Sequence, residues 1–474
     1  MPEQPRVGDR VLHLELEDAW LVDPATSREG RGSIAVEDGR IASVRWAAGS
    51  AAGAEPPAVM VAPALVDLHA HFREPGFEDA ETIATGSAAA AHGGFGTVCL
   101  MANTNPPIDS AAALEEVLQR GRAAGIPLRV HAYGTATLGR AGETLAPMAE
   151  LARAGAVGFS DDGSPIADAS LFRNALAYAG ALHRPLIEHA EQTALTKGAE
   201  AHEGLVATIL GLKGWPAAAE ESAVARALAI LAEVDRAAPS DAGPHLHLAH
   251  ISTAGALELV RRAKAVGLPV TCEATPHHLA FHDGWVAGDR RFAWEAAGAP
   301  WTGGPVEGAA FDTATRVNPP LRTPADALAL WAGLADGTVD AIATDHAPHR
   351  RVDKLVEFGD ALNGIGGLET ALDLVLAGVA AGLLPLPVAV RALTLGPAQL
   401  LAAWSGRPAG SIVPGLVEGA SASLVVVDRG DGWTVSEETL RSKGSNTPLL
   451  GRTLDGRVLA TVVDGRFAHL DGEL

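Results

Sequence analysis

From about residue 61, short β-like runs alternate with longer alanine- and leucine-rich segments of helical period, and this alternation constrains the fold more than any other feature. Two of the helical segments, 110–125 and 252–267, open on Ser or Thr as an N-cap and close on Gly. Eight such units predict an α/β protein, a TIM-like (β/α)8 barrel with its active site at the carboxyl ends of the strands. The expected strands are "ALVDLHA", "TVCLMAN", "LRVHAYG", "AVGFS", "PLIEHA", "HLHLAHI", "PVTCEA" and "DAIATD".

The two ends of the chain do not follow this alternation. Residues 1–60 and 405–474 contain short alternating runs and turn dipeptides, as in "VEDGRIASV" and "VVDGRFAHL", which predict β-hairpins. We expect both ends to build one small composite β-sandwich domain beside a barrel domain of residues 61–404. Residues 281–325, between the seventh and eighth expected strands, form a long insertion rich in Gly, Pro and Trp, and long insertions are often lids over an active site.

Charge and composition exclude some classes of partner. A formal charge of −21 disfavours nucleic acid and anionic membrane surfaces, so an anionic substrate would need local cations or a metal ion. The longest uncharged apolar stretch, 374–390, is interrupted by two prolines and is too short to span a membrane. Cys99 and Cys272 are the only cysteines, both in apolar runs, and the N-terminus lacks a signal-peptide pattern. We therefore expect a cytoplasmic protein with neither a disulfide framework nor a cysteine-rich zinc site.

The first expected strand ends in "DLHAHFREPG", which places imidazoles where the chain leaves the strand. Side chains two residues apart on a strand point the same way, so Asp67, His69 and His71 share a face that looks into the mouth of the barrel. Two histidines at this spacing can chelate one metal ion. Alone, the pair is equally consistent with structural histidines.

Four further strands end in a histidine or an aspartate at the same predicted face: Asp161 and Asp162 after the fourth, His189 after the fifth, His250 after the sixth and Asp345 after the eighth. Helix caps and surface loops would not be expected to repeat this placement. Histidine and carboxylate ligands without thiolates suit zinc or a similar divalent ion, and the set is large enough for a pair of ions. Such ions lower the pKa of bound water and polarise a carbonyl, which predicts a hydrolase.

The motifs occur in the order seen in the amidohydrolase superfamily, and they resemble the cyclic amidohydrolases of the dihydroorotase family, bacterial class I type. The resemblance runs from about residue 60 to 400, and "GDGWTVSEETLRSKGSNTPLLG" resembles the tail of that family. It implies reversible hydrolysis of (S)-dihydroorotate to N-carbamoyl-L-aspartate, the third step of de novo pyrimidine (UMP) biosynthesis, with Zn2+, two ions per chain. The motifs are "HAHFREPG", "MANTNP", "FSDDG", "HAE", "AHIST", "ATPHHL", "VNPPLR", "ATDHAPH" and "GIGGLET".

The resemblance also implies roles for the residues at the strand ends. His69 and His71 match the histidines of the first metal ion, and His189 and His250 those of the second. Asp345 matches an aspartate that binds metal and carries the catalytic proton. Asp162 matches the carboxylate that bridges the ions, where related cyclic amidases use a carboxylated lysine, although its neighbour Asp161 remains an alternative.

On the substrate side, Arg73 offers a planar fork of donors suited to the carboxylate of dihydroorotate. Arg73 could instead form a surface ion pair with Glu74, and Asn103 could be a helix cap. His247, His277 and His278 lack a partner at ligand spacing, so we expect structural or supporting roles for them. The resemblance adds these substrate contacts: Asn103, Asn318, His349 and the backbone of Asn363 and Gly364.

Two other functions compete with this interpretation. One is another cyclic amidase, such as a hydantoinase or allantoinase, against which stand an aspartate at the bridging position and the presence of Arg73 and Asn103. The other is a catalytically silent dihydroorotase-like subunit that only scaffolds aspartate carbamoyltransferase, which loss of metal ligands would indicate. Here no ligand is lost. A homodimer and a complex with that transferase are the macromolecular partners to test.

Overall fold

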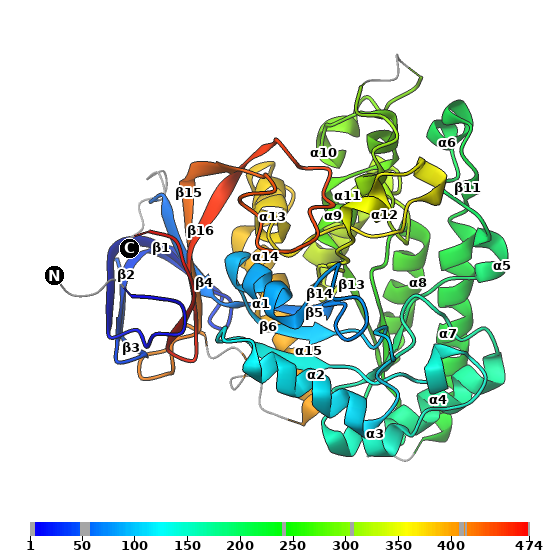
Figure 1. Ribbon diagram of the computed structural model, residues 1–474, viewed down its shortest axis with the longest axis horizontal. Coiled ribbons are helices and arrows are strands. Elements are labelled where there is room, and N and C mark those ends of the chain that lie inside the picture. Colours follow the sequence, from blue (N-terminus) through cyan, green and yellow to red (C-terminus); the bar gives the residue numbers. More distant parts are fainter. Residues whose placement is uncertain are drawn as a thin grey trace.

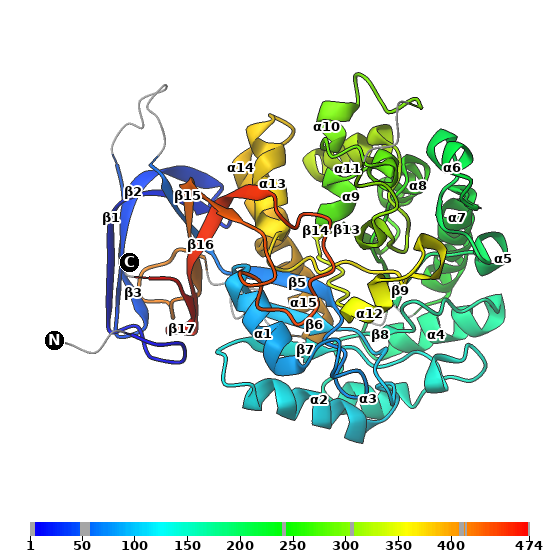
Figure 2. The same cartoon turned by 45° about the horizontal axis from the view of Figure 1, so that its top comes forward.

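The computed structural model describes residues 5–47, 57–238, 243–303, 308–406, 412 and 415–472. Figure 1 shows two parts, a β-sheet that contains strands from both ends of the chain and a larger body in which helices surround a ring of strands. The turned view in Figure 2 keeps the same separation, with β1, β2 and β3 on the side away from the larger body. The predicted pairing of a barrel with a β domain is confirmed.

The larger body contains eight parallel strands, and they coincide with the eight expected runs. They form a three-stranded and a five-stranded group, which parallel bridges join at Gly134 with Phe159 and at Ala70 with His346, so the ring closes. Most of their residues are buried, as expected for parallel strands covered on both faces. The strands are β5 (Leu65–Ala70), β6 (Phe95–Leu100), β7 (Arg129–Ala132), β8 (Phe159–Ser160), β9 (Leu186–Glu188), β12 (Leu246–Leu248), β13 (Val270–Ala274) and β14 (Ala341–Ile342).

Helices follow the barrel strands, and the two helices predicted at 110–125 and 252–267 begin at a Ser or Thr cap. The Ser110 hydroxyl oxygen accepts a hydrogen bond from the Ala113 amide (3.3 Å), and Thr253 caps the next long predicted helix by accepting from the Ala256 amide (3.1 Å). The main barrel helices are α1 (Ile83–His92), α2 (Ala111–Ala123), α3 (Met148–Ala154), α4 (Ala169–Ala181), α7 (Ala218–Ala237), α8 (Ala254–Ala265), α11 (Pro324–Asp336), α13 (Ala371–Ala380), α14 (Leu386–Leu393) and α15 (Leu395–Ser405).

The β domain is one seven-stranded sheet in the order β17, β16, β15, β4, β1, β2, β3. Strands from the N-terminal and C-terminal ends share one hydrophobic cluster, to which Leu21 and Ile34 contribute from one end and Leu424 and Val462 from the other. The exact division of the chain at residues 60 and 405 stays a prediction. The strands are β1 (His13–Asp23), β2 (Arg28–Glu37), β3 (Arg40–Trp46), β4 (Val59–Pro63), β15 (Leu424–Thr434), β16 (Thr453–Val463) and β17 (Arg466–Leu470).

The barrel contains two insertions between its strands. One, between β9 and β12, has a pair of two-residue strands that the sequence did not predict, because so short a run carries no periodicity. The other is the expected insertion at 281–325, whose Trp285 packs in a cluster with Leu449 of the C-terminal part, and its role as a lid stays a prediction. The short elements are η1 (Leu138–Arg140), α5 (Thr193–Thr196), β10 (Ala201–His202), α6 (Leu205–Leu210), β11 (Gly214–Trp215), α9 (Pro276–Ala280), η2 (Asp283–Ala287), α10 (Ala293–Ala296), η3 (Thr313–Thr315), α12 (Arg351–Lys354) and η4 (Phe358–Asp360).

Among the described residues, one helical stretch, Leu386–Ser405, is long and apolar enough to pass a length and composition test for a membrane span. Half of it is buried within the protein, and it divides at Thr394 into α14 and α15. Both helices contribute to the hydrophobic clusters of the barrel, as Val390 and Leu401 illustrate. We interpret the stretch as a pair of core helices.

Candidate metal centre and active site

The carboxyl ends of the barrel strands bring the six predicted ligands together. His69 lies in β5 and His71 directly follows it, while the others follow β8, β9, β12 and β14 within three residues. All six side chains belong to residues that are at most 7% exposed, so they form a buried polar group at the mouth of the barrel. The remaining four are Asp162, His189, His250 and Asp345.

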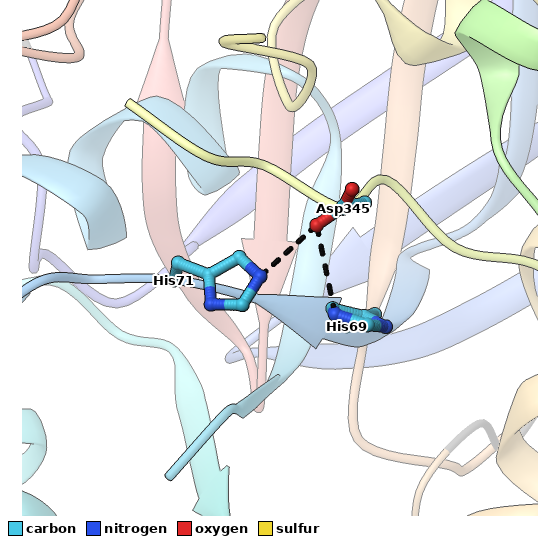
Figure 3. Close-up of side chains that lie close together, drawn as sticks. All are labelled: His69, His71 and Asp345. Atoms are coloured by element: carbon cyan, nitrogen blue, oxygen red, sulfur yellow. Dashed lines mark hydrogen bonds and ion pairs between the residues drawn. The ribbon is translucent and has the colours of Figure 1, made fainter. Parts of the chain in front are cut away.

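Asp345 connects the two histidines of the first strand. Its Oδ1 lies 3.0 Å from His71 Nε2 and 3.5 Å from His69 Nε2 (Figure 3). The backbone of Asp345 is left-handed, with φ +46°. The ligand atoms of these three residues all lie within 4.8 Å of one another, a spacing at which one metal ion could bind them.

Asp162 occupies the middle of the whole group. Its Oδ1 lies 3.6 Å from His69 Nε2 and 3.5 Å from both His189 Nδ1 and His250 Nε2, and its Oδ2 lies 3.6 Å from His71 Nε2. A second set that could hold an ion is formed by His69, Asp162 and His250. One carboxylate therefore faces histidines from three different strand ends, the placement expected of a bridging ligand.

Asp161 points elsewhere. Its Oδ1 accepts hydrogen bonds from the backbone amides of Ala136 (2.9 Å) and Thr137 (3.1 Å), and its Oδ2 accepts from the Thr137 hydroxyl. This carboxylate fixes the loop after β7 and is not part of the histidine group. Of the two adjacent aspartates, the geometry favours Asp162 as the ligand.

Three residues outside the ligand set hold its histidines in orientation. The carboxylate of Glu273, on β13, lies 2.9 Å from His69 Nδ1, and that of Glu191 lies 3.0 Å from His189 Nε2. Asn103 Oδ1 lies 2.8 Å from His71 Nδ1. Because these oxygens accept, the bonded nitrogen of each ring carries the proton and the other nitrogen is left facing the centre. Sequence reasoning missed the roles of Glu273 and Glu191.

Glu273 also contacts His247, whose Nε2 lies 3.2 Å from Glu273 Oε2. Burial by itself would raise the pKa of Glu273, but the neighbouring imidazoles of His247 and His69 outweigh it and lower the pKa to about 2. The carboxylate is therefore ionised at neutral pH. The expectation that His247 has a supporting rather than a ligand position agrees with this contact.

The electrostatics of the group favour bound positive charge. Burial opposes the charged forms of His69 and His189, yet the neighbouring carboxylates raise the pKa of His69 well above its usual value and that of His189 to about 10. In turn, His69, His189 and His250 hold the pKa of Asp162 well below its usual value, against the effect of burial. A bound divalent cation would likewise stabilise the ionised form of Asp162.

The residues fit a metal ion. Within the described part of the chain, His69 Nε2 and Asp162 Oδ1 are buried atoms with no hydrogen-bond partner, and both point into the group. Buried polar atoms are rarely left unsatisfied in proteins, and metal coordination would satisfy both. The donor set of imidazole and carboxylate suits zinc and similar divalent ions, as the sequence indicates.

Arg73 lies beside this group and does not pair with Glu74. Glu74 instead bonds to Arg120 (2.5 Å). Among the described residues, the Arg73 side chain donates only to the Pro348 carbonyl oxygen (3.2 Å), so its two terminal amino groups are available. Burial lowers the pKa of Arg73 to about 10, which still leaves it charged at neutral pH. A cavity of about 420 Å³ is lined by Arg73 and His349.

The other predicted substrate contacts lie on loops of the barrel, where each takes part in a hydrogen bond. Asn318 Nδ2 donates to Glu191 Oε2 (3.1 Å). His349 Nε2 lies 2.7 Å from the Asn363 carbonyl oxygen, and Gly364 directly follows Asn363. Burial lowers the pKa of His349 to about 3, so this imidazole is neutral and available for hydrogen bonding.

Comparisons with known proteins decide the family. The family model described as "Dihydro-orotase-like" matches residues 58–256. A curated dihydroorotase of Anaeromyxobacter sp. (strain K) is 44% identical over 463 residues, covering 97% of this chain and 98% of the relative, and that of Pelotomaculum thermopropionicum is 42% identical over 466 residues, covering 97% and 99%. The chain belongs to the dihydroorotase family. Dihydroorotase activity, an enzymatic hydrolysis of a cyclic amide, is the function that this membership supports.

Solved structures of related folds agree with the architecture. The L-hydantoinase (dihydropyrimidinase) from Arthrobacter aurescens superposes with a TM-score of 0.74 at 24% identity, covering 97% of this chain and 96% of that one. A dihydropyrimidinase from Brevibacillus agri gives 0.69 at 19% identity, covering 96% and 94%. At sequence identities this low, the similarity supports the fold but not the function. The full-length dihydroorotase relatives therefore decide between the dihydroorotase and hydantoinase interpretations.

Proposed function

We propose that the chain hydrolyses (S)-dihydroorotate reversibly to N-carbamoyl-L-aspartate at a centre of two Zn2+ ions. His69, His71 and Asp345 would hold one ion, His189 and His250 the other, and Asp162 would bridge them. The observation that carries the proposal is the Asp162 carboxylate, which lies 3.5 to 3.6 Å from histidines of three strand ends and has an unpartnered, buried Oδ1. The family membership supports the substrate.

When bound, divalent ions lower the pKa of water to about 7 and polarise a carbonyl oxygen. The protein supplies the proton transfer. The Asp345 carboxylate, 3.0 Å from His71 and facing the centre, accepts the proton of the attacking water and then donates it to the ring nitrogen as the amide bond breaks. In the biosynthetic direction the same carboxylate removes the proton from the carbamoyl nitrogen. Asp345 is thus the proposed catalytic residue.

Binding of the charged ring would fall to the residues around the cavity. The guanidinium of Arg73 pairs with the substrate carboxylate through its free amino groups. Asn103, Asn318 and His349 offer side-chain hydrogen bonds, and the backbone of Asn363 and Gly364 closes the site around the ring. An uncharged ring leaves the Arg73 charge unpaired, which disfavours hydantoin and dihydrouracil.

Replacing Asp345 with Asn tests the proton-transfer role. The amide keeps the size of the side chain but cannot accept and return a proton, so we expect turnover to fall by at least about 10²-fold. Binding of dihydroorotate, measured by calorimetry, should stay within about threefold of the parent protein. Asp18→Asn, at an exposed aspartate that pairs with Arg31 in the β domain, is the control and should retain full turnover. Retained turnover in Asp345→Asn would refute the assignment.

We further propose a cytoplasmic location, in keeping with two buried free cysteines. A homodimer and a complex with aspartate carbamoyltransferase are the assemblies that the family suggests. Light scattering of the protein alone and mixed with that transferase tests both. A monomer mass in both experiments would exclude them.

A further inference from the structure

The chain between β15 and β16, residues 435–452, leaves the β domain and reaches across to the barrel (Figure 1). We refer to it as the C-terminal excursion. Its Leu449 packs in a hydrophobic cluster with Ile365 of the barrel. The carboxylate of Glu369 accepts a hydrogen bond from the Arg441 amide (2.7 Å). The excursion is therefore fixed against the loops at the mouth of the barrel.

Asn446 is a residue of the excursion whose side chain bonds to those loops. It is 7% exposed, and its side chain makes three hydrogen bonds. Its Oδ1 accepts from the His349 amide (2.9 Å), and its Nδ2 donates to the carbonyl oxygens of Ala347 (3.1 Å) and Gly364 (3.0 Å). One amide group thus joins the loop after β14 to the loop that contains Gly364.

The two loops are packed closely enough that their relative position matters. A Cβ added at Gly364 would lie 2.7 Å from the Ala347 carbonyl oxygen and 2.8 Å from His349 Nε2. Gly364 has φ +144°, which most other residues avoid. His349 also bonds across to the Asn363 carbonyl oxygen at 2.7 Å. The Asn446 side chain holds this arrangement from the face provided by the excursion.

We propose that Asn446 is a positioning residue for the substrate side of the active site. It sets His349 and the backbone at Gly364 at the distance from each other that the dihydroorotate ring requires. The inference rests on the proposed function, since it takes those two groups as substrate contacts. It adds a residue of the β domain's excursion to the machinery of the barrel.

A residue that only fixed the excursion would affect stability without affecting binding of the ring. A positioning residue should affect the Michaelis constant, because its loops touch substrate, and should leave the proton transfer at Asp345 largely unchanged. The Asn446 side chain bonds to none of the six proposed metal ligands, so the metal content should not change. These readouts separate the two roles.

The test compares Asn446→Ala with the parent enzyme in dihydroorotate hydrolysis, with zinc content and melting temperature measured on the same preparations. We expect KM to rise at least about tenfold, kcat to change less than about threefold, and zinc content to stay the same. Ser445→Ala is the matched control. Ser445 precedes Asn446 in the chain, and among the described residues its side chain bonds only to Glu437 (3.4 Å). It should match the parent in KM.

An unchanged KM in a folded Asn446→Ala protein overturns the inference, whatever happens to its melting temperature, and so does a fall in kcat alone. If that variant does not fold, Asn446→Asp replaces it: the carboxylate keeps the acceptor for the His349 amide and loses both donors, so KM should again rise. A parent protein that does not turn over dihydroorotate contradicts the proposed function instead. The two failures are therefore distinguishable.

Discussion

Glu273→Gln should weaken zinc binding although Glu273 is not a ligand. The carboxylate is 1% exposed and lies 2.9 Å from His69 Nδ1, and its pKa of about 2 keeps it ionised at neutral pH. The substitution keeps the shape and an acceptor oxygen but removes the negative charge. A hydrogen bond to a charged group contributes about 1.5 to 3 kcal/mol and a neutral one about 1 kcal/mol. The difference of about 0.5 to 2 kcal/mol corresponds to a loss of roughly 2- to 30-fold in zinc affinity, and its upper end overlaps the roughly 10- to 100-fold range found for partners of metal-bound histidines.

The assay is a titration of metal-free protein with Zn2+ in competition with a chelator at fixed pH. Glu258→Gln, on the exposed face of α8, is the control and should bind zinc like the parent. Turnover of the Glu273→Gln protein should recover at saturating zinc, because no proposed catalytic group has changed. Zinc affinity within twofold of the parent, in a variant that melts normally, would refute the account of His69 orientation.

Two further substitutions test the assignment of the site. Asp162→Asn should reduce bound zinc to at most one ion per chain, measured by elemental analysis. Asp161→Asn should retain the zinc content of the parent protein, because Asp161 bonds to the loop after β7. Equal losses of zinc in the two variants would contradict the choice of Asp162. Arg73→Gln should raise KM for dihydroorotate by at least about tenfold with a smaller effect on kcat, since it removes the partner of the substrate carboxylate, and an unchanged KM would remove Arg73 from the site.

The positions of the barrel strands and of the candidate metal ligands could be predicted because their signals are local. Strand periodicity placed His69 and His71 on one face, and the closed ring of strands brings His250 and Asp345 to the same end. A local signal, the serine before a helical segment, also predicted the N-cap of α2 at Ser110.

The supporting contacts could not be predicted, because they depend on packing between distant segments. Glu273 is the fourth of the five residues of β13, and its partner His69 is 204 residues away. Asn446 is 97 residues from His349 and belongs to a segment that the sequence assigned to the β domain. The choice between Asp161 and Asp162 needed side-chain directions on a turn, which spacing alone does not give. In each case the sequence showed the type of residue but not the residue that it contacts in the fold.

The most direct test of the account is a comparison of dihydroorotate, dihydrouracil, hydantoin and allantoin as substrates of one preparation, with its metal content measured alongside. We predict hydrolysis of dihydroorotate alone, lost on chelation and restored by zinc. Preferred hydrolysis of an uncharged ring would contradict the role of Arg73, and no turnover by a metal-loaded protein would contradict the catalytic function itself.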